Sequence, residues 1–257
     1  MLSYQHAYHA GNPADLHKHI VLCELLRLLT EKDRGISYIE THAGRALYDL
    51  TSAEAQKTGE ATEGIRRLTM KPDTPYARAL AEVRAMHGDS AYAGSPLLAS
   101  QLLRSQDRIV LMELHPAENA ALKENMRGGW AEIHKRDGYE GLMAIAPPSP
   151  RKGLVLIDPA YEVKTEYDEV ANFIPKLMKK WPEASILLWY PILAARRHDA
   201  MADALSSLPH IRHEVSFTLK GGKGMTGSGL ILINPPWQSE AAFDASLAQS
   251  EHILEKC

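Results

Sequence analysis

Short apolar runs and longer amphipathic stretches alternate along most of this chain. The apolar runs are rich in β-branched residues and too short for helices, so they predict buried strands. These runs occupy residues 36–40, 109–113, 131–135, 153–157, 185–190, 212–219 and 229–233. Helical patterns separate most of them, at residues 116–127, 139–145, 166–180 (interrupted by Pro175) and 193–208. A first helix begins at Asn12-Pro13, where an N-cap residue is followed by proline.

This alternation predicts an α/β fold with a doubly wound, mostly parallel sheet. Only residues 220–228 join the last two predicted strands, which is too few for a helical crossover, so that pair is expected to be antiparallel. A Rossmann-like sheet of seven strands whose last pair is antiparallel is the pattern of class I S-adenosylmethionine-dependent methyltransferases. It differs from the parallel sheet that binds nicotinamide dinucleotides.

Residues 48–92 break this rhythm. They are charged, helix-forming and free of strand signals, and they separate the first predicted strand from the second. A crossover between parallel strands needs about a dozen residues or slightly more, so this segment is longer than the connection requires. The sequence therefore predicts a single domain over residues 1–257 with a small helical insertion at about 48–92.

Composition narrows the class of protein. A chain of 257 residues that is 45% hydrophobic can bury a large core. It contains no apolar run of about 18 residues, so no membrane span is predicted, and its N-terminus lacks the features of a secretory signal. Its two cysteines, Cys23 and Cys257, match neither a disulfide framework nor a zinc site, which fits a reduced cytoplasmic compartment. With a net charge of −3, any nucleic acid must be bound by a local basic face.

The most informative chemistry follows the strand predicted at residues 153–157, which ends in Asp158-Pro159-Ala160-Tyr161. Ligands of open α/β sheets bind just past the carboxyl ends of the strands, where these residues fall. They suit methylation of an exocyclic amine on a nucleobase, because the Asp158 carboxylate and the Pro159 carbonyl can accept the amine hydrogens. Tyr161 is expected to stack on the base, which must first leave its own stack. The alternative is an ordinary Asp-Pro turn.

Two other strand ends carry acids suited to an adenosine cofactor. Glu113 can accept both ribose hydroxyls, and Asp137-Gly138 can take the adenine amine. A solvated strand-end carboxylate is the alternative for Glu113. Ala43-Gly44 after the first strand lets the backbone approach a ligand, although no GxGxxG motif is present. Acids at three strand ends together are rarer by chance than any one of them.

The N-terminal region contains four histidines, His6, His9, His17 and His19. His17 and His19 are two residues apart on a predicted helix and cannot share a face, and no cysteine or acid cluster completes a ligand set. We therefore predict no metal site, and we expect His19 to touch the cofactor or substrate. Ser95-Pro96 is an N-cap with proline at the first helical position, and the Ser95 hydroxyl can also reach the polar tail of a cofactor.

Basic residues near the predicted strand ends are candidates for contacts with phosphates. Lys18, Lys164 and Lys223 are expected to surround the mouth beside Asp158, with Arg66-Arg67 extending the patch. The glycine-rich segment 220–229 lacks the Walker spacing and is expected to be a mobile hairpin loop. The doublets Lys179-Lys180 and Arg196-Arg197 are interpreted as solvated surface charge.

Several motifs follow one another along nearly the whole chain. They are residues 1–12 with Ala14-Asp15 and Lys18-His19, Thr41-His42-Ala43-Gly44, Gly94-Ser95-Pro96-Leu97, Glu113-Leu114-His115-Pro116, Asp137-Gly138, Asp158-Pro159, Trp189-Tyr190-Pro191, and Gly224-Met225-Thr226 through Asn234-Pro235-Pro236-Trp237. In this combination the chain resembles the RlmJ family, the 23S ribosomal RNA adenine-N6 methyltransferases. The helical insertion of that family after the first strand matches residues 48–92.

The resemblance implies S-adenosylmethionine as the methyl donor and assigns roles to residues. Asp158 would act on the target amine at the point where cofactor and substrate meet, and Tyr4 would contact the RNA. The residues implied to bind the cofactor are His19, His42, Ser95, Glu113, Asp137, Gly138 and Asp158. One departure is Ala160, where the family usually has a second proline. The Pro159 carbonyl remains, and the lost stiffness is worth roughly 0.4–1 kcal/mol, which affects the rate rather than the reaction type.

The sequence thus predicts a cytoplasmic enzyme that methylates an adenine N6 of 23S ribosomal RNA, with no membrane and no obligate protein partner. One alternative is a DNA adenine-N6 methyltransferase, which would normally need a recognition domain that is not visible here. A second alternative is a non-catalytic nucleic-acid-binding or DNA-utilisation protein.

Overall fold

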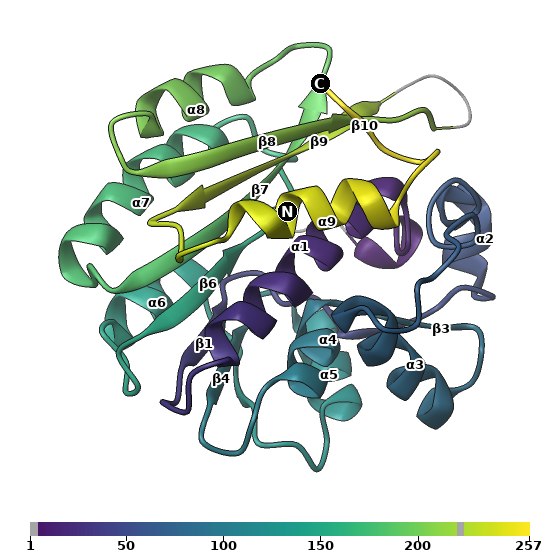
Figure 1. Ribbon diagram of the computed structural model, residues 1–257, viewed down its shortest axis with the longest axis horizontal. Helices are drawn as coiled ribbons and strands as arrows, with labels where there is room; N and C mark the ends of the chain where they lie inside the picture. The colour runs from purple at the N-terminus through teal and green to yellow at the C-terminus, as the bar shows by residue number, and fades with distance from the viewer. Residues whose placement is uncertain (1–4, 220–223) are drawn as a thin grey trace.

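A twisted eight-stranded sheet forms the centre of the computed structural model, which describes residues 5–219 and 224–257 (Figure 1). The strand order is β10-β8-β9-β7-β6-β1-β4-β5. Strands β5, β4, β1, β6 and β7 are parallel, and β9 is antiparallel to both β7 and β8. The strands are β1 (Ser37–Glu40), β4 (Arg108–Met112), β5 (Glu132–His134), β6 (Gly153–Ile157), β7 (Ala184–Leu193), β8 (His210–Ser216), β9 (Met225–Ile233) and β10 (Glu255–Lys256).

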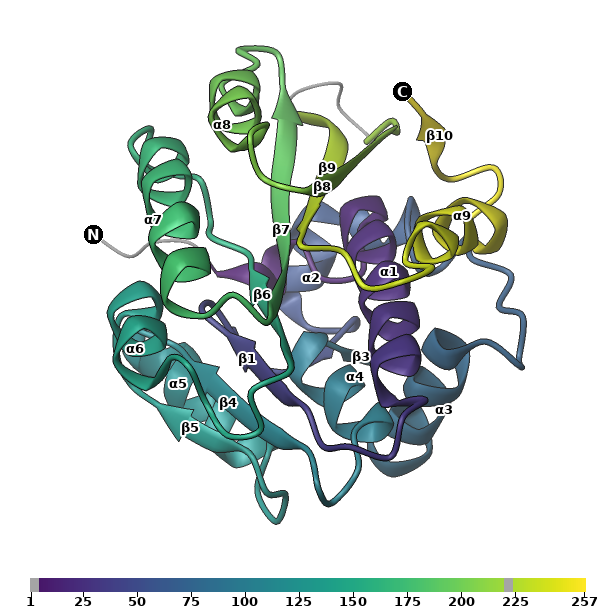
Figure 2. The same ribbon diagram turned by 60° about the vertical axis from the view of Figure 1, so that its left-hand side comes forward.

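Helices cover both faces of the sheet because successive side chains of each strand point to opposite faces. Leu154 and Leu156 of β6 belong to the core beneath α1, and Val155 and Ile157 belong to the core beneath α7. Figure 2 shows α6, α7 and α8 on one side of the sheet and α1, α3, α4 and α9 on the other. The helices are α1 (Pro13–Thr30), α2 (Ala53–Thr58), α3 (Pro75–His87), α4 (Ser95–Leu102), α5 (Pro116–Asn125), α6 (Gly138–Ile145), α7 (Glu166–Lys180), α8 (His198–Leu205) and α9 (Glu240–Gln249), with short 3-10 turns η1 (His6–Tyr8) and η2 (Glu60–Thr62).

The predicted strands are all present, and the antiparallel pairing of the last two is confirmed by the β8–β9 register. The structure adds an eighth strand, β10, whose Glu255 and Lys256 pair with β8. Both β10 residues are exposed, so no hydrophobic alternation marks them in the sequence. Backbone pairing with β8 holds this edge strand, together with a hydrogen bond from the Ser216 hydroxyl to the Glu255 carbonyl at 3.4 Å.

The segment 48–92 was expected to be a small helical insertion without strands, and its two ends differ from that expectation. It contains α2, η2 and α3, but it begins and ends in a two-stranded antiparallel sheet of β2 (Leu47–Asp49) and β3 (Ala91–Ala93). Each strand has three residues, too short for a period-two pattern to stand out. The pairing brings the two ends of the segment together, next to the end of β1.

Three local predictions are corrected. Helix α8 is shorter than residues 193–208, since β7 continues to Leu193, residues 194–197 form a turn, and the helix ends at Leu205. Helix α7 runs without a break through Pro175, because its apolar face is buried against the sheet at Val170, Ile174 and Leu177. Residues 225–229 of the expected glycine-rich loop belong to β9, where they pair with β7 and β8, and residues 220–223 lie outside the described residues.

The topology gathers the candidate site at one edge of the sheet. The carboxyl ends of β1, β4, β6 and β7 share that edge because these strands are parallel. Helix α1 begins at the same edge, where the Asn12 side chain accepts the Asp15 amide at 2.9 Å as its N-cap. Within the described residues, no helix is both long and apolar enough to cross a bilayer.

Candidate active site

A cavity of about 510 Å3 opens at this edge of the sheet. Its wall comes from the N-terminal segment and α1, from the residues after β1, β4 and β6, and from the end of β7. The starts of α4 and β9 and two residues of the insertion, Tyr48 and Glu60, complete it. The cavity is lined by eight of the residues predicted for the site, Lys18, His19, His42, Ser95, Glu113, Asp158, Pro159 and Tyr161. Residues more than a hundred positions apart in the chain therefore meet in one site.

The remaining predicted residues lie elsewhere. The Asp137 side chain caps α6 by accepting the Glu140 amide at 2.9 Å, and neither Asp137 nor Gly138 lines the cavity. A Cβ on Gly138 would come within 2.1 Å of the Thr41 carbonyl oxygen, so glycine is needed for the close approach of α6 to the end of β1. Lys164 is exposed in the turn after β6, outside the cavity lining. Tyr4 and Lys223 lie outside the described residues, so their roles stay predictions.

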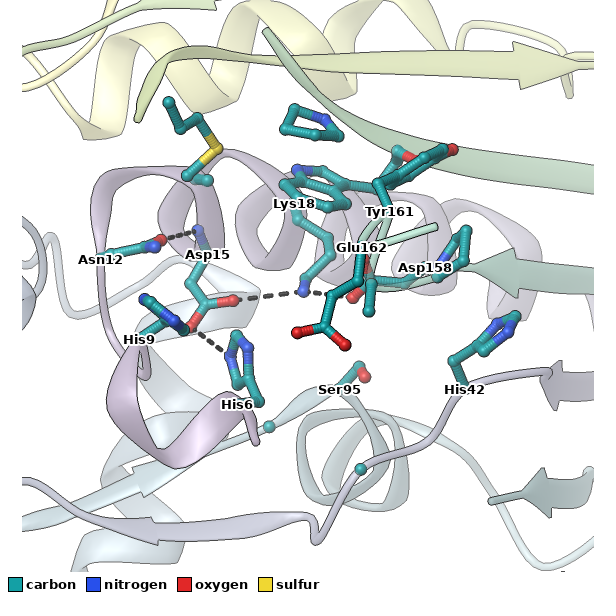
Figure 3. Close-up of a pocket in the computed structure, with 18 of the residues that line it drawn as sticks. His6, His9, Asn12, Asp15, Lys18, His42, Ser95, Asp158, Tyr161 and Glu162 are labelled. Atoms are coloured by element: carbon teal, nitrogen blue, oxygen red, sulfur yellow. Dashed lines mark hydrogen bonds and ion pairs between the residues drawn. The ribbon is translucent and has the colours of Figure 1, made fainter. Parts of the chain in front are cut away.

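Asp158 is held by a buried lysine. The Lys18 Nζ lies 2.5 Å from Asp158 Oδ2 and 3.2 Å from Asp15 Oδ1, and the Lys18 side chain is only 6% exposed (Figure 3). Burial alone would lower the pKa of Lys18, but the two carboxylates outweigh it and raise that pKa above its ordinary value. Lys18 lies beside Asp158 as expected, but its place on α1 directs the ammonium inward, between Asp15 and the end of β6, rather than outward at the mouth.

Asp15 organises the N-terminal side of the cavity. Its carboxylate bonds to His6 Nε2 at 2.9 Å, to the Gly11 amide at 2.9 Å and to Lys18 (Figure 3). Burial favours the neutral acid, yet His6 and Lys18 hold the pKa of Asp15 well below its usual range. In the sequence, Asp15 stood out only as an acid near the start of the first helix and as part of the family motif Ala14-Asp15. The spacing of Asp15 and Lys18, three positions apart on one helix, was the available signal.

Glu113 is anchored by the backbone. Its two oxygens accept the Gly44 amide at 2.9 Å and the His115 amide at 2.7 Å. Burial raises the pKa of Glu113 above its ordinary value, and the two amide hydrogen bonds act in the opposite sense. Each carboxylate oxygen has two acceptor sites, so both can still receive a hydroxyl from the cavity.

Ser95 is tied to a third carboxylate, Glu40 at the end of β1. The Ser95 hydroxyl donates to Glu40 Oε2 at 2.7 Å, and the Tyr38 hydroxyl donates to Oε1 at 2.7 Å. Burial raises the pKa of Glu40 to about 8 despite these hydrogen bonds. When Glu40 is ionised, the Ser95 hydroxyl donates to it and the Ser95 oxygen meets the cavity as an acceptor.

Two of the histidines that line the cavity, His19 and His42, are neutral. His19 Nδ1 lies 2.9 Å from the Tyr92 hydroxyl, and burial lowers the pKa of His19 to about 3. His42 Nδ1 lies 2.8 Å from the Thr41 hydroxyl, and burial lowers the pKa of His42 to about 4. Both can offer a ring nitrogen to a ligand without adding charge.

Two aromatic residues shape the wall beside Asp158. Tyr161 has a positive φ of 54°, its hydroxyl donates to the Trp189 carbonyl at 2.9 Å, and its ring packs on Tyr167 with centroids 4.4 Å apart. Stacking of Tyr161 on a base stays a prediction. Trp189 also lines the cavity, with its ring centroid 5.6 Å from Lys18 Nζ. Sequence reasoning used Trp189 only as part of a family motif.

Known proteins resemble this chain over most of its length. The family model for "Ribosomal RNA large subunit methyltransferase D, RlmJ" matches residues 33–255. The chain is 40% identical over 252 residues to "Ribosomal RNA large subunit methyltransferase J" of Haemophilus influenzae, covering 93% of this chain and 89% of that protein. It is 39% identical over 251 residues to the protein of the same name from Escherichia coli, with the same coverage.

A solved structure agrees with these relatives. Protein LPL1258 from Legionella pneumophila superposes with a TM-score of 0.84 at 34% identity, covering 93% of this chain and 92% of that one. The predicted α/β fold of class I methyltransferases is confirmed. Because the family model spans most of the chain and the relatives share about two fifths of its residues, the chain belongs to the RlmJ family of ribosomal RNA large subunit methyltransferases.

Proposed function

We propose that this protein transfers a methyl group from S-adenosylmethionine to the N6 amine of an adenine in 23S ribosomal RNA, in the cytoplasm. Family membership supports the ribosomal RNA methyltransferase activity. The observation that carries the choice of an amine is the end of β6, where Asp158 and Pro159 line the cavity. A carboxylate and a carbonyl side by side match the two hydrogens of an exocyclic amine.

The residues present fit the cofactor. A volume of about 510 Å3 lies in the range of small-molecule sites. Glu113 would receive the ribose hydroxyls on the acceptor sites that the Gly44 and His115 amides leave. Ser95 and the neutral rings of His19 and His42 would hold the polar tail. When bound, S-adenosylmethionine supplies an electrophilic methyl group on a cationic sulfur.

Asp158 prepares the nucleophile. Lys18 binds Oδ2, so Oδ1 can accept one hydrogen of N6 while the Pro159 carbonyl accepts the other. These contacts favour a pyramidal nitrogen with an available lone pair, and Asp158 can take up the proton that N6 loses. Catalysis is mostly positioning plus electrostatic stabilisation in a partly closed site.

Lys18 gives this arrangement a further property. Because its ammonium also lies 3.2 Å from Asp15, it can remain paired while Asp158 engages the amine. Burying a single unpaired ammonium would cost several kcal/mol, and a second carboxylate removes that cost. The pair Asp15–Lys18 thus supports an Asp158 that can exchange partners.

Contacts with RNA beyond the target base rest on the sequence. Tyr4, Lys164 and Lys223 remain the candidates for those contacts, and Lys164 is exposed on the same edge of the sheet as the cavity. A DNA substrate is the second candidate function because the Asp158–Tyr161 tetrapeptide would serve it equally. The named relatives favour RNA.

Labelled methyl transfer tests the proposal. Purified protein is incubated with S-adenosylmethionine carrying a labelled methyl group and with unmodified 23S RNA, and the labelled base is mapped by nuclease digestion. We expect N6-methyladenosine at a single position. The matched control is Asp158→Asn, which keeps the side-chain volume. Label on double-stranded DNA but not on RNA would replace RNA as the substrate, and tight cofactor binding without transfer to either would support a binding protein.

A further inference from the structure

Buried hydrogen bonds connect the cavity to a histidine pair behind it. The Trp189 Nε1–H donates to Ser228 Oγ at 2.9 Å, and the same oxygen lies 2.9 Å from His17 Nδ1. His17 Nε2 lies 2.9 Å from His213 Nδ1. These four residues come from β7, β9, α1 and β8, and Ser228 and His17 are fully buried.

The donor and acceptor roles in this series of hydrogen bonds follow from the group at its first end, the Trp189 indole. An indole N–H can only donate, so Ser228 Oγ accepts from Trp189. The Ser228 hydroxyl then donates to His17 Nδ1, and His17 Nε2–H donates to His213 Nδ1. Burial lowers the pKa of both histidines, so both rings are neutral as this scheme requires. The reverse direction would leave the Ser228 hydrogen without an acceptor in this chain. Within the described part of the protein, His213 Nε2 is buried without a hydrogen-bond partner.

Trp189 is the point where this chain meets the site. Its indole lies 5.6 Å from the Lys18 ammonium, and its carbonyl accepts the Tyr161 hydroxyl at 2.9 Å. Lys18 binds Asp158 directly, and Tyr161 follows Asp158 by three residues in the chain. The orientation of this indole therefore limits the space beside Asp158 in which a base can lie.

We propose that Ser228 and His17 are positioning residues, which lock the Trp189 indole in the orientation that leaves room for the acceptor base beside Asp158. This inference rests on the proposed function, because it concerns the acceptor side of the same cavity. Ser228 and His17 do not line the cavity, so they act through Trp189. A ring held by one hydrogen bond to a fully buried oxygen is preorganised, and a free ring must be ordered each time a base binds.

The main experiment is a double-mutant cycle between Ser228→Ala and Trp189→Phe, which keeps a ring but removes the N–H. We expect Ser228→Ala to lower kcat/KM for RNA about tenfold while the Kd for S-adenosylmethionine changes less than twofold. In the Trp189→Phe background the same change should have no further effect. If the losses in kcat/KM of the two single variants multiply in the double variant, the proposal is wrong.

The matched control is Ser185→Ala. Ser185 is equally buried on β7, but its hydroxyl donates to the Asn234 carbonyl at the opposite end of the strand. We expect Ser185→Ala to lower the stability of the fold as Ser228→Ala does, but to leave kcat/KM for RNA unchanged. An equal fall in kcat/KM for both variants would mean that any buried serine of this sheet matters, which contradicts positioning.

A spectroscopic readout separates this inference from the proposed function. The indole ¹H–¹⁵N signal absent from Trp189→Phe identifies Trp189, and Ser228→Ala should shift it while Ser185→Ala leaves it in place. An unshifted signal would overturn the inference even if RNA is methylated. A shifted signal in a protein that methylates no RNA would leave the indole lock intact and reject the proposed function.

His17 gives a second, independent pair of variants. Asparagine places an oxygen near the position of Nδ1 and can still accept from Ser228, whereas glutamine reaches the position of Nε2. We expect His17→Asn to retain at least threefold more kcat/KM for RNA than His17→Gln. Equal losses would show that His17 does not act through Ser228, and this pair also decides the matter if Ser228→Ala does not fold.

Discussion

Glu113 and Asp158 occupy equivalent positions and are held in opposite ways. They follow β4 and β6, the two neighbours of β1, and both line the same cavity. The backbone amides of Gly44 and His115 hold Glu113, whereas a lysine from a helix 140 residues away in the sequence holds Asp158.

The difference separates binding from chemistry. A carboxylate held by backbone amides can move only if those hydrogen bonds break and the local backbone shifts. Glu113 therefore offers a rigid acceptor to a ligand. A carboxylate paired with a flexible side chain can exchange that partner for another, as Asp158 must when an amine arrives. Interactions that form only as the reaction proceeds raise the rate, whereas fixed ones mainly set affinity.

Removing Asp158 is expected to have the largest effect. Asp158→Ala should lower methyl transfer by more than about a thousandfold, because polarisation and orientation of the amine are lost together. The Kd for S-adenosylmethionine should rise less than about tenfold, roughly 1.4 kcal/mol. Single-turnover kinetics and calorimetry measure the two quantities. Substantial turnover by this folded variant would remove Asp158 from the mechanism.

Lys18 tests whether Asp158 depends on its partner. Lys18→Met should lower kcat about a hundredfold and destabilise the fold by about 3–5 kcal/mol, since two carboxylates lose a buried counter-ion. Because Lys18 is buried, the salt dependence of RNA binding should not change. A log–log salt slope flatter by about 0.7 would instead show that Lys18 contacts a phosphate, as the sequence suggested.

A substitution of Glu113 tests the role of the carboxylate that the backbone holds rigidly. Glu113→Ala should weaken S-adenosylmethionine binding by roughly 1.5–3 kcal/mol, about 10- to 150-fold, through loss of charge-assisted hydrogen bonds. At saturating cofactor, kcat should change much less. Titration calorimetry provides the affinity. The control is Glu132→Ala, which removes an exposed acid on β5 that pairs with Arg108 of β4. A large fall in kcat at unchanged affinity would reverse the roles of the two acids.

Glu40 lies at the end of β1, between the strands that carry Glu113 and Asp158. Its replacement is expected to have the smallest effect, on the pH dependence of stability. Its pKa of about 8 in the folded protein exceeds the ordinary glutamate value, so the folded state favours the protonated form. The stability that Glu40 contributes is full below about pH 4.5 and is lost as pH rises towards 8. Glu40→Gln should therefore gain stability relative to wild type over this range. Denaturant unfolding at pH 5 and pH 8 measures it, and a constant difference would contradict the assignment.

Strand positions were predictable because burial on both faces leaves a continuous apolar run, as at Gly153–Ile157. The start of α1 was predictable because Asn12 and Pro13 carry their own capping signals. The pair β2–β3 and the strand β10 were not, since strands of two or three residues have no readable period. The continuity of α7 through Pro175 depends on packing against the sheet, which overrides local propensity.

The sequence by itself determined the α/β fold class, the acids at the strand ends and the family resemblance, because these depend on local pattern and on motif order. Only the tertiary structure decided the partners of those acids. Lys18 meets Asp158 across 140 residues, and His17 meets Ser228 across 211. No local periodicity records such contacts, since they depend on how α1 packs against β6, β7 and β9. Lys18 was expected at the mouth beside Asp158 as a contact for phosphates, and packing of α1 made it the buried counter-ion of Asp158.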